Sequence, residues 1–201
     1  MKILFGFNAM FVQVLDECPT DDGVLQAMTI AWRELHHPEK VCLMYEKAVS
    51  KEPQNEDFLS HLFMSYVRMG EYKKQQKVGM DLFKVANKNP YYYWSVMSLV
   101  LQALADEKLG KTVQLPLALR MLEKMEREGR VEQEQEIMLL CLVLEMSEDW
   151  SAGVKLLQGP LGHKLAQSGG YKTFFNSKSL EWQQKLENWS EVSDVLQIND
   201  N

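Results

Sequence analysis

The sequence predicts an all-α protein built of repeated helical hairpins. Apolar residues recur at the three- and four-residue spacing of amphipathic helices along most of the chain. The prolines fall between those segments or in their first turns, where a missing N–H does least harm. They occupy positions 19, 38, 53, 90, 116 and 160. We find no convincing pair of segments that alternates as paired β-strands do.

The expected helices follow from apolar stripes, each of which would form one buried helix face. In chain order these stripes are Leu25, Met28, Trp32 and Leu35; Leu59, Leu62, Phe63 and Tyr66; Trp94, Met97, Leu101 and Leu104; Ala118, Met121, Leu122 and Met125; Ile137, Leu140, Cys141 and Leu144; Trp150, Val154 and Leu157; and Trp189, Val192 and Leu196.

A repeat period connects the first hairpins. Pro19 and Pro53 lie 34 residues apart (53 − 19), which is the period of the tetratricopeptide (TPR) helix-turn-helix unit. Val41, Tyr45 and Ala48 then occupy positions where the second helix of a TPR unit is buried. These features predict TPR-like repeats that form a right-handed α-solenoid.

A turn signal, an aromatic residue just after a polar turn, recurs three times. It is found at Gly70-Glu71-Tyr72-Lys73, Glu148-Asp149-Trp150-Ser151 and Glu187-Asn188-Trp189-Ser190. The spacing predicts about five hairpins in one segment spanning 1–201. Their expected ranges are 22–52, 56–88, 91–127, 132–159 and 174–198, with 1–18 as half a hairpin and a loop interruption from Pro160 to Gly170.

Composition excludes several classes of protein. The 201 residues are 46% hydrophobic and 25% charged, as in ordinary globular chains, and the net charge of −6 argues against a dedicated nucleic-acid binder. Cys18, Cys42 and Cys141 are too widely separated for a disulfide framework. No stop-transfer segment and no convincing signal peptide occur. We therefore expect a soluble, cytoplasmic protein without a membrane partner.

No motif predicts catalysis, a cofactor or a metal site. Gly110-Lys111-Thr112 resembles the end of a phosphate-binding loop, but Ala105 stands where its first glycine should be, so a loop between helices is expected. The four histidines lack metal-ligand spacing. Cys42 and Cys141 lie on helical faces and are expected to be buried. We expect a protein that is not an enzyme.

Charge gives the one candidate binding surface. Lys73, Lys77, Lys84 and Lys88 would form a narrow stripe if they lay on one helix. Such a stripe can be an ordinary solvated face or a docking site for phosphate or an acidic partner. Both interpretations remain open from the sequence.

Four segments carry a more specific resemblance: Pro19-Thr20-Asp21-Asp22, Ser60-His61-Leu62-Phe63-Met64, Val67-Arg68-Met69-Gly70-Glu71-Tyr72-Lys73-Lys74 and Lys88-Asn89-Pro90-Tyr91-Tyr92-Tyr93-Trp94-Ser95-Val96-Met97-Ser98-Leu99. With these segments the chain resembles the auxiliary, TPR-containing subunit of the NatB N-terminal acetyltransferase complex. The resemblance runs from about Val12 to Leu165 and departs at 1–10 and 169–178.

The resemblance implies a non-catalytic scaffold, and this chain would be a shortened form of a much longer one. In that family a small GNAT-fold catalytic subunit acetylates N-termini such as Met-Asp, Met-Glu, Met-Asn and Met-Gln. The auxiliary chain also helps to bring the enzyme to the ribosome. The family supplies no site residues for this sequence, although the lysine stripe is a physically reasonable contributor to ribosome docking.

Two other functions remain open. A TPR adaptor would hold a peptide or partner helix in its concave groove, but Gln26, Ile30, Ser60 and Met64 offer few donors to a terminal carboxylate. A plain structural arm would only stabilise a longer solenoid.

Overall fold

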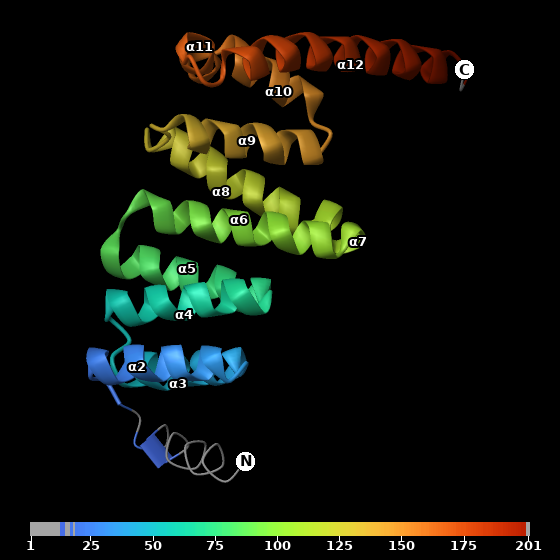
Figure 1. Ribbon diagram of the computed structural model, residues 1–201. Helices are drawn as coiled ribbons and strands as arrows, with labels where there is room; N and C mark the ends of the chain where they lie inside the picture. Colours follow the sequence, from blue (N-terminus) through green and yellow to red (C-terminus); the bar gives the residue numbers. More distant parts are fainter. Residues whose placement is uncertain (1–12, 15–16, 18, 200–201) are drawn as a thin grey trace. The chain divides into compact units, whose positions relative to one another are not determined.

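A computed structural model describes residues 13–14, 17 and 19–199, with side chains as far as Trp189 (Figure 1). The described residues contain helices, turns and no β-strand. They belong to two compact units, which divide after Leu101. The half hairpin expected at 1–18 falls largely outside the described residues, as does Cys18.

The first unit is a series of packed helices. They are α2 (Asp22–Glu34), α3 (Pro38–Lys51), α4 (Glu56–Met69), α5 (Tyr72–Ala86) and the first part of α6 (Asn89–Ala105). α2 packs on α3, α3 on α4 and α4 on α5, so neighbours in sequence are neighbours in space (Figure 1). This local pairing is the organisation of helical-hairpin repeats.

Local sequence accounts for the ends of these helices. The Asp21 side chain accepts the N–H of Val24 and caps α2, and Pro38 starts α3 at a position where its missing N–H costs nothing. The Asn55 side chain accepts the N–H groups of Asp57 and Phe58 at 3.1 and 3.2 Å and caps α4. Gly70, with φ of 68°, ends α4 in the left-handed conformation that glycine adopts most readily.

The core of the first unit confirms the predicted repeat positions. The following nine residues are all buried: Leu25, Met28, Trp32, Val41, Tyr45, Ala48, Leu59, Leu62 and Tyr66. Phe63 of α4 stacks on Trp94 of α6 with ring centroids 4.9 Å apart. Gly79 lets α5 approach α6, because a Cβ there would lie 2.4 Å from Ser95 Oγ.

The second unit contains the remaining helices. They are α7 (Glu107–Leu109), the π-helix η1 (Gly110–Gln114), α8 (Leu115–Arg127), α9 (Glu134–Met146), α10 (Trp150–Gln158), α11 (Pro160–Gln167) and α12 (Lys172–Asn199). α9 packs on α8, α10 and α11, and α12 packs on α10 and α11. The predicted residues Ala118, Leu122, Met125, Ile137 and Leu140 are all buried here.

Two glycines bring helices of the second unit into close contact. A Cβ on Gly153 of α10 would lie 2.6 Å from Cε3 of Trp182, a fully buried residue of α12. A Cβ on Gly162 of α11 would lie 2.0 Å from the Leu157 carbonyl oxygen. Real side-chain atoms do not approach so closely, so both positions depend on the absence of a side chain.

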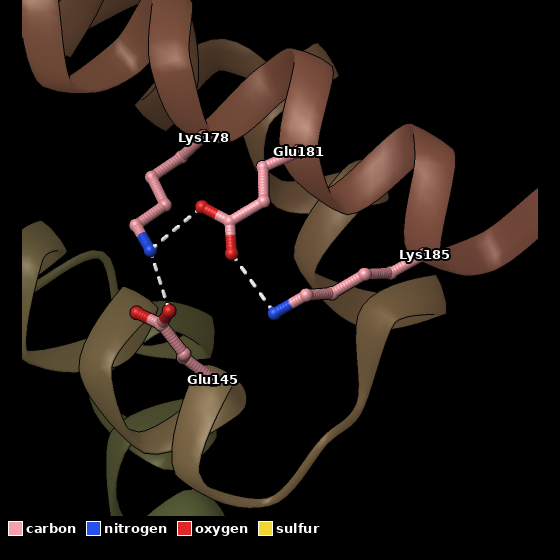
Figure 2. Close-up of polar contacts among 4 residues, drawn as sticks. All are labelled: Glu145, Lys178, Glu181 and Lys185. Atoms are coloured by element: carbon pink, nitrogen blue, oxygen red, sulfur yellow. Dashed lines mark hydrogen bonds and ion pairs between the residues drawn. The ribbon is translucent and has the colours of Figure 1, made fainter.

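A network of ion pairs connects α12 to α9 (Figure 2). Lys178 Nζ donates to Glu145 Oε1 at 2.5 Å and to Glu181 Oε2 at 3.0 Å. Lys185 Nζ lies 2.9 Å from the other Glu181 oxygen and 4.1 Å from the centroid of the Trp150 ring. Burial alone would lower the pKa of Lys178, but its hydrogen bonds to the two carboxylates outweigh this and raise it. Lys178 therefore remains charged while mostly buried.

The expected turn at 187–190 is wrong, because α12 runs without a break through these residues. The range 174–198, expected as a hairpin, consequently lies within one helix. Trp189 is 68% exposed, and Trp182 is the aromatic residue that α12 buries. An aromatic residue that follows two polar residues can stand just after a turn or in the middle of a helix. The local sequence does not distinguish these two positions.

The loop expected from Pro160 to Gly170 is also wrong over most of its length, because α11 occupies Pro160–Gln167. Gly159 is extended and Pro160 stands in the first turn, a favourable helix start. Similarly, the loop expected around Gly110 is the π-helix η1, which continues into α8.

The stripe predicted for α6 lies only partly on the buried face, because Trp94 packs against the core but other members of the stripe do not. Met97 and Leu104 are 40% and 67% exposed, whereas Val96 and Val100 are buried. This helix is apolar nearly all round, so its periodicity alone does not select the buried side.

Candidate docking surface

Three of the four predicted lysines lie on one face of α5. Lys73, Lys77 and Lys84 are exposed, while Val78 and Leu82 of the same helix are buried. At 3.6 residues per turn the three lysines fall within about 40° around the helix axis. We call Lys73, Lys77 and Lys84 the α5 basic face.

Lys88 does not belong to this face, which corrects the prediction. α5 ends at Ala86, and Asn87 adopts a left-handed conformation with φ of 51°. This residue turns the chain before Lys88, so helical spacing no longer applies there. Asparagine tolerates the left-handed region better than most residues do.

Lys88 instead belongs to a contact between α4 and the start of α6. Its Nζ lies 2.6 Å from Glu56 Oε1, and the Tyr91 hydroxyl donates to the same oxygen. The hydrogen bonds from Lys88 and then Tyr91 hold the pKa of Glu56 below its ordinary value. Burial, followed by the hydrogen bond to Glu56, raises the pKa of Tyr91 to about 12. Lys88 thus has an internal partner and is a poor docking cation.

The three lysines of the α5 basic face differ in whether an acidic residue already pairs with them. Lys84 Nζ lies 2.8 Å from Asp81 Oδ1 on the same helix. Lys73 and Lys77 have no ion pair among the described residues. Such surface cations lose little by contacting a partner, because no internal pair has to break.

The sequence does not reveal the role of Lys74, which lies beside the basic face. Its Nζ is 3.8 Å from Glu46 Oε1 and 5.4 Å from the centroid of the Tyr66 ring. The Tyr66 hydroxyl donates to Glu46 Oε1 at 2.5 Å. Burial, and then this hydrogen bond, raise the pKa of Tyr66. These contacts join α3, α4 and α5, and no local sequence signal distinguishes Lys74 from Lys73.

The cysteines and the lysine that were considered for other chemistry are engaged in the packing and ion pairs of the fold. Cys42 and Cys141 are buried, as predicted, and burial raises the pKa of both thiols, that of Cys141 to about 12. Lys111 pairs with Glu148 at 3.2 Å within the second unit. Across the part of the chain that the structure describes, no three His, Cys, Asp or Glu residues are grouped to hold a metal ion. None of its helices is long and apolar enough to cross a membrane.

The paired helices and the exposed charged face define a helical-repeat scaffold, a class of protein that presents extended surfaces to partners. Comparison with known proteins shows which family of helical-repeat proteins the chain belongs to. The profile of the family described as Psidin, N-terminal TPR repeats region, matches residues 7–199. The chain belongs to this family.

Named relatives agree with that assignment. The chain is 47% identical over 177 residues to the human protein named N-alpha-acetyltransferase 25, NatB auxiliary subunit, which covers 87% of this chain. It is 38% identical over 188 residues, or 92% of its length, to the phagocyte signaling-impaired protein of Drosophila pseudoobscura pseudoobscura. It spans only 18% and 19% of the lengths of these two relatives.

A solved structure shows a similar fold. A MamA chain from Desulfovibrio magneticus RS-1 that runs from position 41 to the end superposes with a TM-score of 0.53 at 16% sequence identity. The alignment covers 91% of this chain and all of the MamA chain. At this identity the similarity concerns the helical-repeat fold alone, and it confirms the predicted TPR-like, all-α architecture.

Proposed function

We propose that this chain is a non-catalytic scaffold segment of a cytoplasmic NatB N-terminal acetyltransferase complex. A GNAT-fold catalytic subunit would be its partner and would acetylate N-termini that begin Met-Asp, Met-Glu, Met-Asn or Met-Gln. The observation that supports this most is the 47% identity, over 87% of the chain, to a protein named as a NatB auxiliary subunit. The catalytic chemistry would then belong to the partner.

The structure suggests how such a segment contributes. Within each unit the helices bury one face and leave the other free, so a partner can contact several helices at once. The ion pair of Lys74 with Glu46 joins α5 to α3, and that of Lys88 with Glu56 joins the start of α6 to α4. A scaffold whose helices are fixed in this way loses little conformational entropy when a partner binds.

An acetylation assay tests the proposal. A Met-Asp peptide and acetyl-CoA are incubated with the chain alone, with the NatB catalytic subunit alone, and with both together. We expect no acetylation by the chain alone and a higher kcat/KM for the mixture than for the catalytic subunit. An unchanged kcat/KM in the mixture would count against a supporting role for this segment.

The α5 basic face would contribute to ribosome association. Exposed lysines attract RNA phosphate, and this attraction weakens steeply as salt increases. We expect the double variant Lys73→Glu/Lys77→Glu to reduce co-sedimentation of the chain with ribosomes at low salt. The matched control is Lys108→Glu/Lys172→Glu, which makes the same charge change at exposed positions of the second unit. Equal co-sedimentation of both variants would argue against this face.

A further inference from the structure

A groove with an apolar floor and one acidic edge lies on the second unit. Its volume is about 420 Å³, within the lower range of roughly 300–1,000 Å³ found for ligand pockets. α8 contributes Leu119, Glu123 and Glu126, while Leu140 and Leu144 come from α9. α10 and the start of α11 complete it. We call this hollow the α8–α11 groove.

The floor of the groove results from helix packing. Leu140 and Leu144 are one turn apart on α9 and are buried beneath it. Ala152 of α10 has a small side chain, which leaves space between α10 and its neighbours. Gly162 allows α11 to lie directly against α10, which places Leu161 at the edge of the groove.

The edge formed by α8 carries two exposed carboxylates. Glu123 and Glu126 are exposed, and neither carboxylate has an ion pair among the described residues. Leu119, Glu123 and Glu126 fall within about 60° around the helix axis, so both acids flank the same apolar strip. Lys155 of α10 is the basic residue among those that line the groove.

We propose that the α8–α11 groove binds a basic amphipathic helix of a protein partner. Apolar side chains of that helix would fill the space above Leu140 and Leu144, and lysine or arginine residues along its edge would pair with Glu123 and Glu126. The acidic edge disfavours nucleic acid, anionic lipid and acidic peptides, since each would place negative charge beside two carboxylates. An apolar strip flanked by charge is the arrangement that helix-in-groove recognition uses.

The α8–α11 groove is distinct from the α5 basic face, and its binding of a basic helix does not require the NatB assignment. The partner is defined by its chemistry alone. Its binding can therefore be tested on the chain by itself.

A labelled helical peptide with leucines on one face and lysines along one edge serves as the probe, and fluorescence anisotropy measures its Kd. We expect saturable binding, and we expect Glu123→Gln/Glu126→Gln to weaken it by roughly three- to tenfold, the combined effect of two exposed ion pairs. Ala152→Leu should also weaken binding by filling the hollow. A peptide with glutamates in place of the lysines should bind less tightly than the probe.

The control variant Glu132→Gln/Glu134→Gln removes the same charge outside the groove, from the exposed Glu132 and the half-buried Glu134. It should bind the probe as the unmodified chain does, and circular dichroism confirms that every variant is folded. Equal weakening by both double variants would show non-specific charge attraction and overturn the proposal. Absence of saturable binding, or unchanged binding by both Glu123→Gln/Glu126→Gln and folded Ala152→Leu, would overturn it as well.

Discussion

Trp182 of α12 packs against the backbone of Gly153 on α10, so closely that a Cβ on the glycine would lie 2.6 Å from its ring. The tryptophan is fully buried. These two residues are 29 positions apart in sequence (182 − 153), and their contact fixes the last long helix onto the second unit.

Gly153→Ala should destabilise the chain by about 1–3 kcal/mol, because the new methyl group would force Trp182 or α10 to move. The sign is informative, since replacing glycine by alanine in a helix normally stabilises it by roughly 0.5–1 kcal/mol. Urea unfolding measures the difference in free energy. Ser151→Ala, at an exposed position of the same helix, is the control. A stabilised Gly153→Ala variant would show that Trp182 does not pack in this way.

Lys178→Met should destabilise the chain by about 1–3 kcal/mol, because it leaves the Glu145 and Glu181 carboxylates without their shared donor. Lys172→Met, at an exposed position of α12, should have little effect. In a double-mutant cycle, Glu145→Gln combined with Lys178→Met should cost less than the sum of the single changes. Additive single effects would indicate that Lys178 and Glu145 do not interact.

Lowering the pH should weaken the contribution that Glu181 makes to the stability of the folded chain. Hydrogen bonds from Lys185 and then Lys178 lower the pKa of this carboxyl from its ordinary value of 4.5. A carboxyl whose pKa is lowered by folding stabilises the folded state above its unfolded pKa, and this is lost as the pH falls through the folded value. The stability difference between the unmodified chain and Glu181→Gln should therefore be constant above pH 4.5 and shrink below it. Urea unfolding over this pH range measures it, and a difference that grew on acidification would have the wrong sign.

Cys141 should resist alkylation in the folded chain. Burial raises its pKa to about 12, so the reactive thiolate is scarce at neutral pH, and the folded helices also block access. Iodoacetamide labelling followed by peptide mass spectrometry should find Cys141 unmodified without denaturant and fully modified in urea. Rapid labelling of native Cys141 would contradict the burial of this side chain on α9.

The sequence predicts the first unit better than the second. In the first unit a 34-residue step between Pro19 and Pro53 fixes which residues face inward, and the structure buries those residues. Repeat spacing is informative there because neighbouring hairpins contact each other locally.

The sequence does not predict which residues are buried where a long-range contact decides between two similar local patterns. Trp182 and Trp189 both lie on α12, and only the packing of Trp182 on Gly153 distinguishes the buried one. The candidate lysine stripe shows the same limit, since one left-handed residue, Asn87, removes Lys88 from the helix. The α8–α11 groove combines residues from four helices, and no single segment of sequence marks it.

Co-expression of this chain with the NatB catalytic subunit tests the central claim most directly, with native mass spectrometry of the purified material to read stoichiometry. A scaffold segment predicts a stable one-to-one complex that persists through purification. A folded chain that purifies entirely free of the catalytic subunit would contradict the claim.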